Sequence, residues 1–332
     1  MAEIKVVDLV KHYVQKKTID HNGVKARRQV VKAVDGVTFT LAPGEILGII
    51  GESGCGKSTL GRVLVDLEEP TSGQITIDGV STREILRKDR LAFRRQAQIV
   101  FQNPFDSFDP RHTIRRVLMD VLKLHRIGRD DEERLKIILD RMEDAGLHPA
   151  ADYLDRYPFE LSGGQLQRIS ILRSMLLDPK FLVADEPVSM LDVSVRADII
   201  NMLLRLVREK GTSMVFISHD IATTRYISDR VAVMYLGRIV ELGRTDDILH
   251  DPQHPYTQAL IANCASLDPN EKRQRIALPG EPPTPIGTGP GCYFAPRCRF
   301  ATDRCRKEYP PACIAPNGCA VTCFRHEKKE GQ

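Results

Sequence analysis

The chain has 332 residues, of which 42% are hydrophobic and 28% charged, a balance that is typical of a globular protein and excludes a disordered one. Its 48 basic and 44 acidic residues leave a net charge of +4, which is too small to indicate nucleic-acid binding on electrostatic grounds. No run of 18 apolar residues exists, and residues 1–5 do not resemble a secretory signal. We therefore expect a soluble, cytoplasmic protein.

Strand and helix signals alternate in the first hundred residues. Apolar residues on alternate positions predict a strand at 36–41, and a Pro-Gly turn separates it from a buried strand at 45–50. A helix-competent run follows at 59–67, and another strand and turn are predicted at 74–79. This order is typical of an α/β protein.

The middle of the chain, from about 103 to 177, changes to helical periodicity. Four apolar residues are predicted on one face of an amphipathic helix, namely Leu166, Ile169, Leu172 and Leu176. Strand signals then return at 180–184, 214–218 and 231–235. We predict an α/β fold with a helical insertion, and the segment described next adds that this fold is of the P-loop type.

The strongest local signal is the segment 51–59, which matches the pattern of Gly, four residues and Gly-Lys-Ser. Glycines allow backbone N–H groups to surround phosphate oxygens, and the helix that follows directs its positive end at them. Lys57 is expected to reach the β and γ phosphates, and Ser58 to bind Mg²⁺. The predicted ATP contacts in this loop are Gly51, Ser53, Gly54, Cys55, Gly56, Lys57, Ser58 and Thr59.

Two further segments suit phosphate chemistry. The apolar strand at 180–184 delivers Asp185 and Glu186 at its C-terminal end, where ligands bind in open α/β sheets. Asp185 suits the Mg²⁺ shell, and Glu186 is placed to polarise the attacking water. The segment 161–165 places two glycines after a serine, which suits an anion, although the same residues also suit an ordinary capped helix start.

Six elements in one order carry a resemblance to a known family: the loop at 51–59, Gln102, the segment 161–165, the pair Asp185-Glu186, Asp192 and His219. In this order the chain from about 4 to 265 resembles the nucleotide-binding domain of ATP-binding cassette (ABC) proteins. The resemblance implies that Gln102 senses the γ-phosphate and that His219 orients Glu186. Tyr13 is the implied adenine-stacking residue, with a surface or core role as the alternative.

The same resemblance implies residues that act across a dimer. Ser162, Gly163, Gly164 and Gln165 are similar to the signature motif, which closes on ATP held by an opposite subunit. Asp192 is similar to the aspartate at the dimer interface.

Further segments narrow the resemblance to the ATPase subunits of dipeptide and oligopeptide importers; they are 103–111, 157–160, 254–257, 278–283 and 291–298. The implied partners are a second ATPase, as a copy or a different chain, two membrane permeases and an extracytoplasmic solute-binding protein. The implied location is peripheral, on the cytoplasmic face of the membrane, with no nucleic-acid partner. Importers of nickel, glutathione or oligosaccharides stay open as alternatives, as does a non-transport ABC ATPase with a redox- or metal-sensing tail.

We predict an ABC ATPase domain at 1–265, with a helical subdomain at about 103–177, and a Pro- and Cys-rich extension at 266–332. Six of the eight cysteines lie in that extension, and in a reducing compartment such a cluster indicates metal binding before disulfides. Ligand chemistry and the resemblance together favour a 4Fe–4S cluster, with zinc or no metal as alternatives. The predicted ligands are Cys292, Cys298, Cys305 and Cys323, with Cys319 or Cys313 as substitutes.

Overall fold

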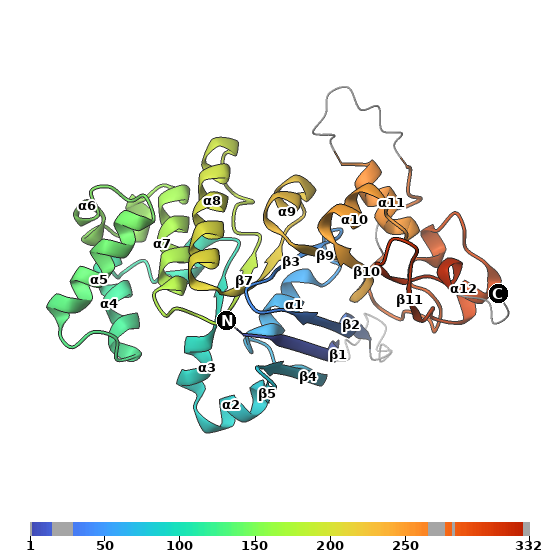
Figure 1. Ribbon diagram of the computed structural model, residues 1–332, viewed down its shortest axis with the longest axis horizontal. Coiled ribbons are helices and arrows are strands. Elements are labelled where there is room, and N and C mark those ends of the chain that lie inside the picture. The colour runs from blue at the N-terminus through green and yellow to red at the C-terminus, as the bar shows by residue number, and fades with distance from the viewer. Residues whose placement is uncertain (1, 15–28, 265–275, 281–282, 328–332) are drawn as a thin grey trace, which may run out of the picture. The chain divides into compact units, whose positions relative to one another are not determined.

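The structure, a computed structural model, describes residues 2–14, 29–264, 276–280 and 283–327 (Figure 1). The chain forms two compact units, each assembled from three separate segments. The first unit comprises Met1–Ile4, Leu41–Glu45 and Thr76–Val215. The second unit comprises Lys5–Thr40, Ile46–Ile75 and Phe216–Gln332. The predicted domain boundary at 265/266 falls where residues are not described and stays a prediction.

The first unit combines a small part of a parallel sheet with a group of helices. Strands β6 (Ala97–Val100) and β7 (Phe181–Asp185) are parallel, with Ala97 opposite Phe181. Helices and no strand occupy residues 103–177, all of which are described, and Figure 1 shows α4 to α7 as one group. The helices of this unit are α2 (Thr82–Lys88), α3 (Arg90–Gln96), η1 (Pro104–Ser107), α4 (Ile114–Leu124), α5 (Asp131–Asp144), α6 (Ala151–Leu154), η2 (Pro158–Glu160), α7 (Gly163–Met175) and α8 (Val193–Lys210).

Helix α7 differs from its prediction. It was expected to have one apolar face, but Gln167, Ser170 and Ser174 are buried together with its apolar residues. The reason is that α5, α8, β6 and η1 all contact this helix and leave it little surface. The helix ends at Met175, so Leu176 is its C-cap residue and not part of the predicted face.

The second unit contains most of the larger sheet. Its strand order is β11-β12-β10-β9-β3, with β3 and β9 parallel and the other pairs antiparallel. Strand β8 (Ser213–Ile217) crosses the division, because its first three residues belong to the first unit and its last two to the second. The other strands that lie wholly or mostly in this unit are β1 (Ile4–Val14), β2 (Val30–Leu41), β3 (Ile46–Ile50), β4 (Ser72–Ile77), β9 (Arg230–Tyr235), β10 (Arg238–Arg244), β11 (Ala312–Ile314) and β12 (Ala320–Thr322). Strand β5 (Val80–Ser81) belongs to the first unit.

Five helices and two single turns accompany this sheet: α1 (Lys57–Leu64), α9 (Ile221–Ile227), α10 (Thr245–His250), α11 (Pro255–Ala262), η3 (Ala295–Arg297), α12 (Asp303–Lys307) and η4 (Phe324–His326). Every residue of β3 and β8 is buried, which explains their unbroken apolar sequences. The strands predicted at 45–50 and 214–218 are therefore confirmed to within one residue.

The cysteine-rich segment is part of this unit's core. Strands β11 and β12 extend the sheet beyond β10, and Figure 1 shows these C-terminal elements beside α11. Phe294 packs against Tyr235 and Tyr256, at ring-centroid distances of 5.3 and 5.5 Å. The segment is thus anchored by side chains as well as by backbone hydrogen bonds.

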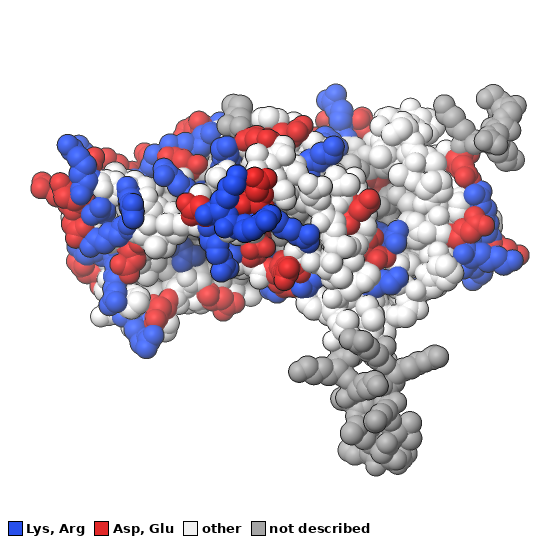
Figure 2. Space-filling view, turned by 90° about the horizontal axis from the view of Figure 1, so that it is seen from below, with Lys and Arg blue, Asp and Glu red and all other residues white. Residues whose placement is uncertain are grey.

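Charge is mixed over the surface. Figure 2 shows basic and acidic side chains interspersed on the face that it presents. Within the described ranges, we find no helix with both the length and the apolar character that a bilayer crossing requires.

Candidate ATP site

The phosphate loop lies between β3 and α1, as predicted, in the second unit. Strand β3 ends at Ile50 and helix α1 begins at Lys57, so the loop meets the positive end of the helix. The buried Lys57 ammonium donates hydrogen bonds to the backbone carbonyls of Gly51, at 2.8 Å, and Glu52, at 3.0 Å. The loop therefore holds a positive charge at its centre, which suits a phosphate group.

Two glycines of this loop are required by close backbone approaches. A Cβ atom at Gly51 would lie 2.2 Å from the carbonyl oxygen of Met234, and one at Gly56 would lie 2.0 Å from that of Ala33. Both glycines also have positive φ, +155° and +104° respectively. Gly54 has a positive φ as well, but nothing lies within 4 Å of its Cβ position.

Three further predicted residues lie in the same unit. Tyr13 is near the end of β1, where its hydroxyl donates to Glu68 and the Lys11 ammonium lies 5.0 Å from its ring centroid. Partial burial, together with the Glu68 carboxylate, raises the pKa of the Tyr13 hydroxyl. Cys55 is buried, which raises its thiol pKa and fits a packing role. His219 is exposed and follows β8.

The predicted carboxylates lie in the first unit. Asp185 is the buried last residue of β7, and Glu186 follows it with a φ of +47°, a conformation that few non-glycine residues adopt. Gln102 Nε2 donates a hydrogen bond to Glu186 Oε2 at 3.1 Å. The fold thus brings together two predicted catalytic residues that are 84 positions apart in the sequence.

The predicted signature residues form the start of α7. Ser162 caps this helix, because its Oγ accepts from the Gln165 N–H at 3.3 Å while Gln165 Oε1 accepts from the Ser162 N–H at 3.0 Å. A Cβ atom on Gly164 would lie 2.7 Å from Val195 Cγ1, and one on Gly163 would lie 3.5 Å from Leu191 Cδ2. The signature segment therefore packs against the start of α8, whose exposed N-cap residue is Asp192.

The predicted residues thus divide between the two units. Tyr13, the loop at 51–59 and His219 belong to the second unit. Gln102, the pair Asp185-Glu186, the segment 162–165 and Asp192 belong to the first unit.

Sequence reasoning missed one partner of the phosphate loop. Arg297 Nη1 and Nη2 donate to the two carboxylate oxygens of Glu52 at 2.7 and 3.2 Å. The hydroxyl of Tyr256 accepts from the Glu52 N–H at 2.8 Å. No sequence signal could have found the first contact, because Glu52 and Arg297 are 245 positions apart and each lies at a position that its own motif leaves unspecified.

The four cysteines predicted as ligands line one cavity of about 240 Å³: Cys292, Cys298, Cys305 and Cys323. Burial raises the pKa of the Cys292 thiol to about 11 and also raises the pKa values of Cys298 and Cys323. The two possible substitutes lie elsewhere, since Cys319 packs against Gly243 and the Cys313 thiol faces the Pro311 carbonyl. Nowhere in the described part of the chain are three or more His, Cys, Asp or Glu side chains arranged to hold a single metal ion.

Comparisons with known proteins agree with this architecture. The family described as ABC transporter matches residues 34–189, and the oligopeptide/dipeptide transporter C-terminal region matches residues 240–305. The dipeptide transport ATP-binding protein DppF of Haemophilus influenzae is 46% identical over 97% of this chain and 96% of its own length. The putative oligopeptide transport ATP-binding protein YkfD of Bacillus subtilis is 44% identical over 92% of both chains.

A solved structure supports the fold. The dimeric, post-hydrolysis ATP-binding cassette MJ0796, bound to ADP and Pi, has a TM-score of 0.62 and 27% identity, and covers 73% of this chain and 98% of its own. The fold and site therefore define an ABC-type ATPase, which uses ATP and Mg²⁺. Within that class, the chain belongs to the family of dipeptide and oligopeptide transport ATP-binding proteins. The predicted resemblance is confirmed.

Proposed function

We propose that this ATPase energises the uptake of dipeptides or oligopeptides through partner membrane permeases, from the cytoplasmic face of the membrane. Its relatives are named as dipeptide and oligopeptide transport proteins, and these names and the family match at 240–305 support a peptide solute. They disfavour the nickel, glutathione, oligosaccharide and non-transport alternatives. We place a helical subdomain at about 103–177 and a C-terminal extension at 266–332 within this subunit.

In the proposed site, the loop at 51–59 binds the phosphates through its backbone N–H groups and Lys57, and Tyr13 stacks on adenine. Ser58 and Asp185 would hold Mg²⁺, which neutralises phosphate charge when bound. The oxygen donors of these two residues fit that ion.

Glu186 is the proposed base that accepts a proton from the attacking water, and His219 orients it. The hydrogen bond between Gln102 and Glu186 carries this assignment. It holds the Glu186 carboxylate next to Gln102, the residue proposed to sense the γ-phosphate.

A second ATPase subunit, as a copy or a related chain, is proposed to complete the site. Ser162 and Asp192 are exposed at the starts of α7 and α8, so the signature segment 162–165 is available to ATP on an opposite subunit. The dimeric state of the solved relative supports this arrangement. The permeases and an extracytoplasmic solute-binding protein complete the proposed importer.

The proposed base is tested with Glu186→Gln in the complete complex. We expect kcat for ATP hydrolysis to fall at least about 100-fold, because the water loses its general base, while ATP binding persists. The control is Glu84→Gln, which changes an exposed carboxylate in α2 and should leave kcat unchanged. A normal rate in Glu186→Gln would contradict the assignment.

The solute is tested by stimulation of ATP hydrolysis. The complex reconstituted with its permeases should hydrolyse ATP faster when its binding protein carries a dipeptide or oligopeptide. Nickel, glutathione and an oligosaccharide form the comparison panel, and stimulation by one of them instead of peptide would replace the proposed solute.

For the extension, we propose that Cys292, Cys298, Cys305 and Cys323 hold a 4Fe–4S cluster. Their position around one cavity supports four thiolate ligands. A single zinc ion held by the same thiolates, or no metal, stays the alternative to this cluster. When bound, the cluster would supply iron–sulfur cross-links between segments of the extension.

Anaerobic purification with iron and sulfide analysis tests the cluster. About four iron and four sulfide per chain are expected, and Cys298→Ser should lower both. Cys313→Ser serves as the matched control, because Cys313 does not line the cavity. A colourless protein without iron would end this proposal.

A further inference from the structure

We infer that Arg297, in the C-terminal extension, is a positioning residue for the phosphate loop. Its guanidinium holds the Glu52 carboxylate and thereby fixes the part of the loop that controls Lys57. The inference rests on the proposed ATP site and adds to it a residue that lies outside every nucleotide-binding segment considered above.

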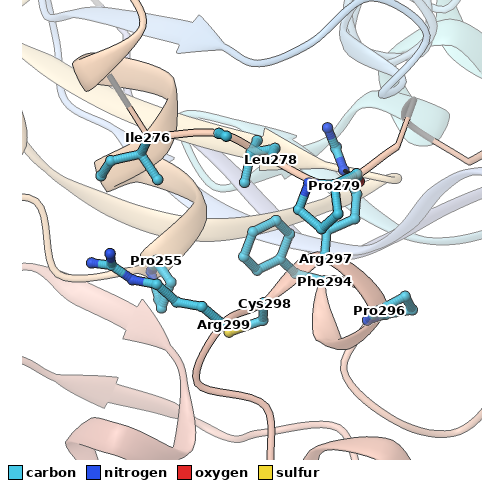
Figure 3. A pocket seen from close by; sticks show the side chains of 10 residues that line it. Pro255, Ile276, Leu278, Pro279, Phe294, Pro296, Arg297, Cys298 and Arg299 are labelled. Carbon is cyan, nitrogen blue, oxygen red and sulfur yellow. Dashed lines mark hydrogen bonds between the residues drawn. The ribbon is translucent and has the colours of Figure 1, made fainter. Parts of the chain in front are cut away.

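The contact between Arg297 and Glu52 is a paired, charge-assisted hydrogen bond. Both terminal guanidinium nitrogens reach the carboxylate, and the Arg297 side chain is only 6% exposed. Two further donors of Arg297 are also engaged, because Nε donates to the carbonyl of Pro279 at 3.2 Å and Nη2 to that of Gly280 at 3.4 Å. Figure 3 shows Arg297 beside Pro279 in a small pocket of this extension.

Glu52 is fixed at three points, of which Arg297 supplies one. Its backbone N–H donates to the Tyr256 hydroxyl, and its carbonyl accepts from the Lys57 ammonium. A shift of Glu52 would therefore move a hydrogen-bond acceptor of Lys57, the side chain proposed to contact the β and γ phosphates. This is the path by which Arg297 would act on ATP without touching it.

The pair also controls charge at the loop. A Glu52 carboxylate without its counter-charge would repel a triphosphate bound to the same loop. Hydrogen bonding to Glu52 is the main reason that the pKa of Arg297 is raised, so its positive charge persists at any physiological pH. Arg297 thus supplies both a fixed geometry and a compensating charge.

The turn that carries Arg297 is itself held firmly. Arg297 is the last residue of η3, and Phe294, directly before this turn, is 2% exposed and packs on Tyr235 and Tyr256. Arg299, two residues further on, is exposed, and Figure 3 shows its side chain extending in a different direction from that of Arg297. This neighbour therefore offers a matched control.

The test compares Arg297→Gln with Arg299→Gln in the full-length protein. ATP affinity is measured by equilibrium titration with Mg-ATP, and kcat and KM by steady-state hydrolysis in the complete complex. We expect Arg297→Gln to raise Kd and KM for ATP about tenfold, with kcat at saturating ATP changed less than about threefold. Arg299→Gln should match the unmodified protein in all three constants.

Two further variants separate positioning from a general loss of structure. Arg297→Lys keeps the charge but not the paired geometry, so we expect an intermediate rise in Kd. The double variant Glu52→Gln/Arg297→Gln removes the unpaired carboxylate but does not restore the positioning contact, so Kd should fall only part of the way from the Arg297→Gln value towards normal. A lower melting temperature of Arg297→Gln with an unchanged Kd for ATP would indicate that Arg297 has a purely structural role.

Either of two results overturns the inference: Arg297→Gln with normal ATP affinity, or a double variant with fully normal affinity, which would show that charge repulsion alone accounts for the effect. Failure of the proposed ATP site, on which the inference rests, has a different signature, since the unmodified protein would then not bind Mg-ATP at all.

Discussion

Unusual backbone conformations or close backbone approaches occur at three residues of the proposed ATP site. Glu186 has a φ of +47°, and Gly51 and Gly56 combine positive φ values with backbone contacts that leave no room for a Cβ atom. A conformation such as that of Glu186 costs a non-glycine residue about 1–3 kcal/mol and persists only where the surrounding structure enforces it, whereas glycine adopts positive φ without this cost. Substitution by alanine tests how much free energy a side chain costs at each glycine of the loop.

Gly56→Ala should destabilise the protein more than Gly54→Ala. Both substitutions place a side chain on a residue with positive φ, which costs about 1–2 kcal/mol. Only the first also drives a Cβ atom to 2.0 Å from the Ala33 carbonyl, so we expect a total loss of at least about 3 kcal/mol and of ATP binding. Urea unfolding and Mg-ATP titration measure both effects; equal losses in the two variants would show that the backbone contact is unimportant.

The contribution of Asp35 to the free energy of unfolding depends on pH. Burial raises its pKa, but hydrogen bonds with Tyr293, His12 and Arg238 outweigh burial and lower it to about 2. Because the pKa of Asp35 is lower in the folded protein than in the unfolded chain, where it is near 4, ionised Asp35 stabilises the fold at pH values above 4. This contribution of about 2 kcal/mol disappears as the pH falls towards 2.

The stability difference between the unmodified protein and Asp35→Asn should therefore shrink as the pH falls from 5 to 3. Urea unfolding at each pH measures it, with the exposed Asp303→Asn as the control. A difference that stays constant over this range would show that ionised Asp35 is not the stabilising species.

At the scale of elements, the cap of α11 is sensitive to pH in a way that its sequence does not reveal. His254 is buried, and its Nδ1 accepts a hydrogen bond from the Tyr256 N–H at 3.1 Å, which requires an unprotonated nitrogen. Burial, with His326 and Arg325 nearby, lowers the pKa of His254 to about 3. The stabilisation is therefore complete above the ordinary pKa near 6.5 and is lost as the pH falls towards 3.

Between pH 7 and pH 5 we expect His254 to account for a loss of about 2 kcal/mol in the free energy of unfolding. His254→Asn, which keeps a side-chain cap but does not titrate, should remove this loss. The control is His250→Asn on the exposed surface of α10, which should retain the pH dependence of the unmodified protein. Thermal unfolding at both pH values decides between these outcomes.

The elements could be predicted from sequence wherever the pattern was local. The apolar runs of β3 and β8 predicted strands at the observed positions. The glycines of the phosphate loop predicted the observed strand–loop–helix unit. Burial of α7 on all sides could not be predicted, because it results from elements distant in the sequence. The same holds for the Gln102–Glu186 contact, which was implied only by family resemblance, and for Arg297–Glu52, which no pattern indicated.

At the scale of the whole molecule, the extension contributes to the core of the second unit. Phe294 is 2% exposed in a cluster with Tyr235 and Tyr256, so Phe294→Ala should cost about 3–5 kcal/mol in unfolding free energy. Phe159, which is 66% exposed, provides the control, and Phe159→Ala should cost less than about 1 kcal/mol. Chemical denaturation measures both; a small loss in Phe294→Ala would show that the extension adds little to the core.

The interleaved segments of the two units have a consequence for synthesis on the ribosome. The phosphate loop is made early, but the unit that contains it also includes Phe216–Gln332, a segment that is translated much later. We therefore expect a nascent chain to expose residues 51–59 well before their surroundings, including Tyr256 and Arg297, have emerged. Nucleotide affinity should therefore develop only after those two residues have joined the loop.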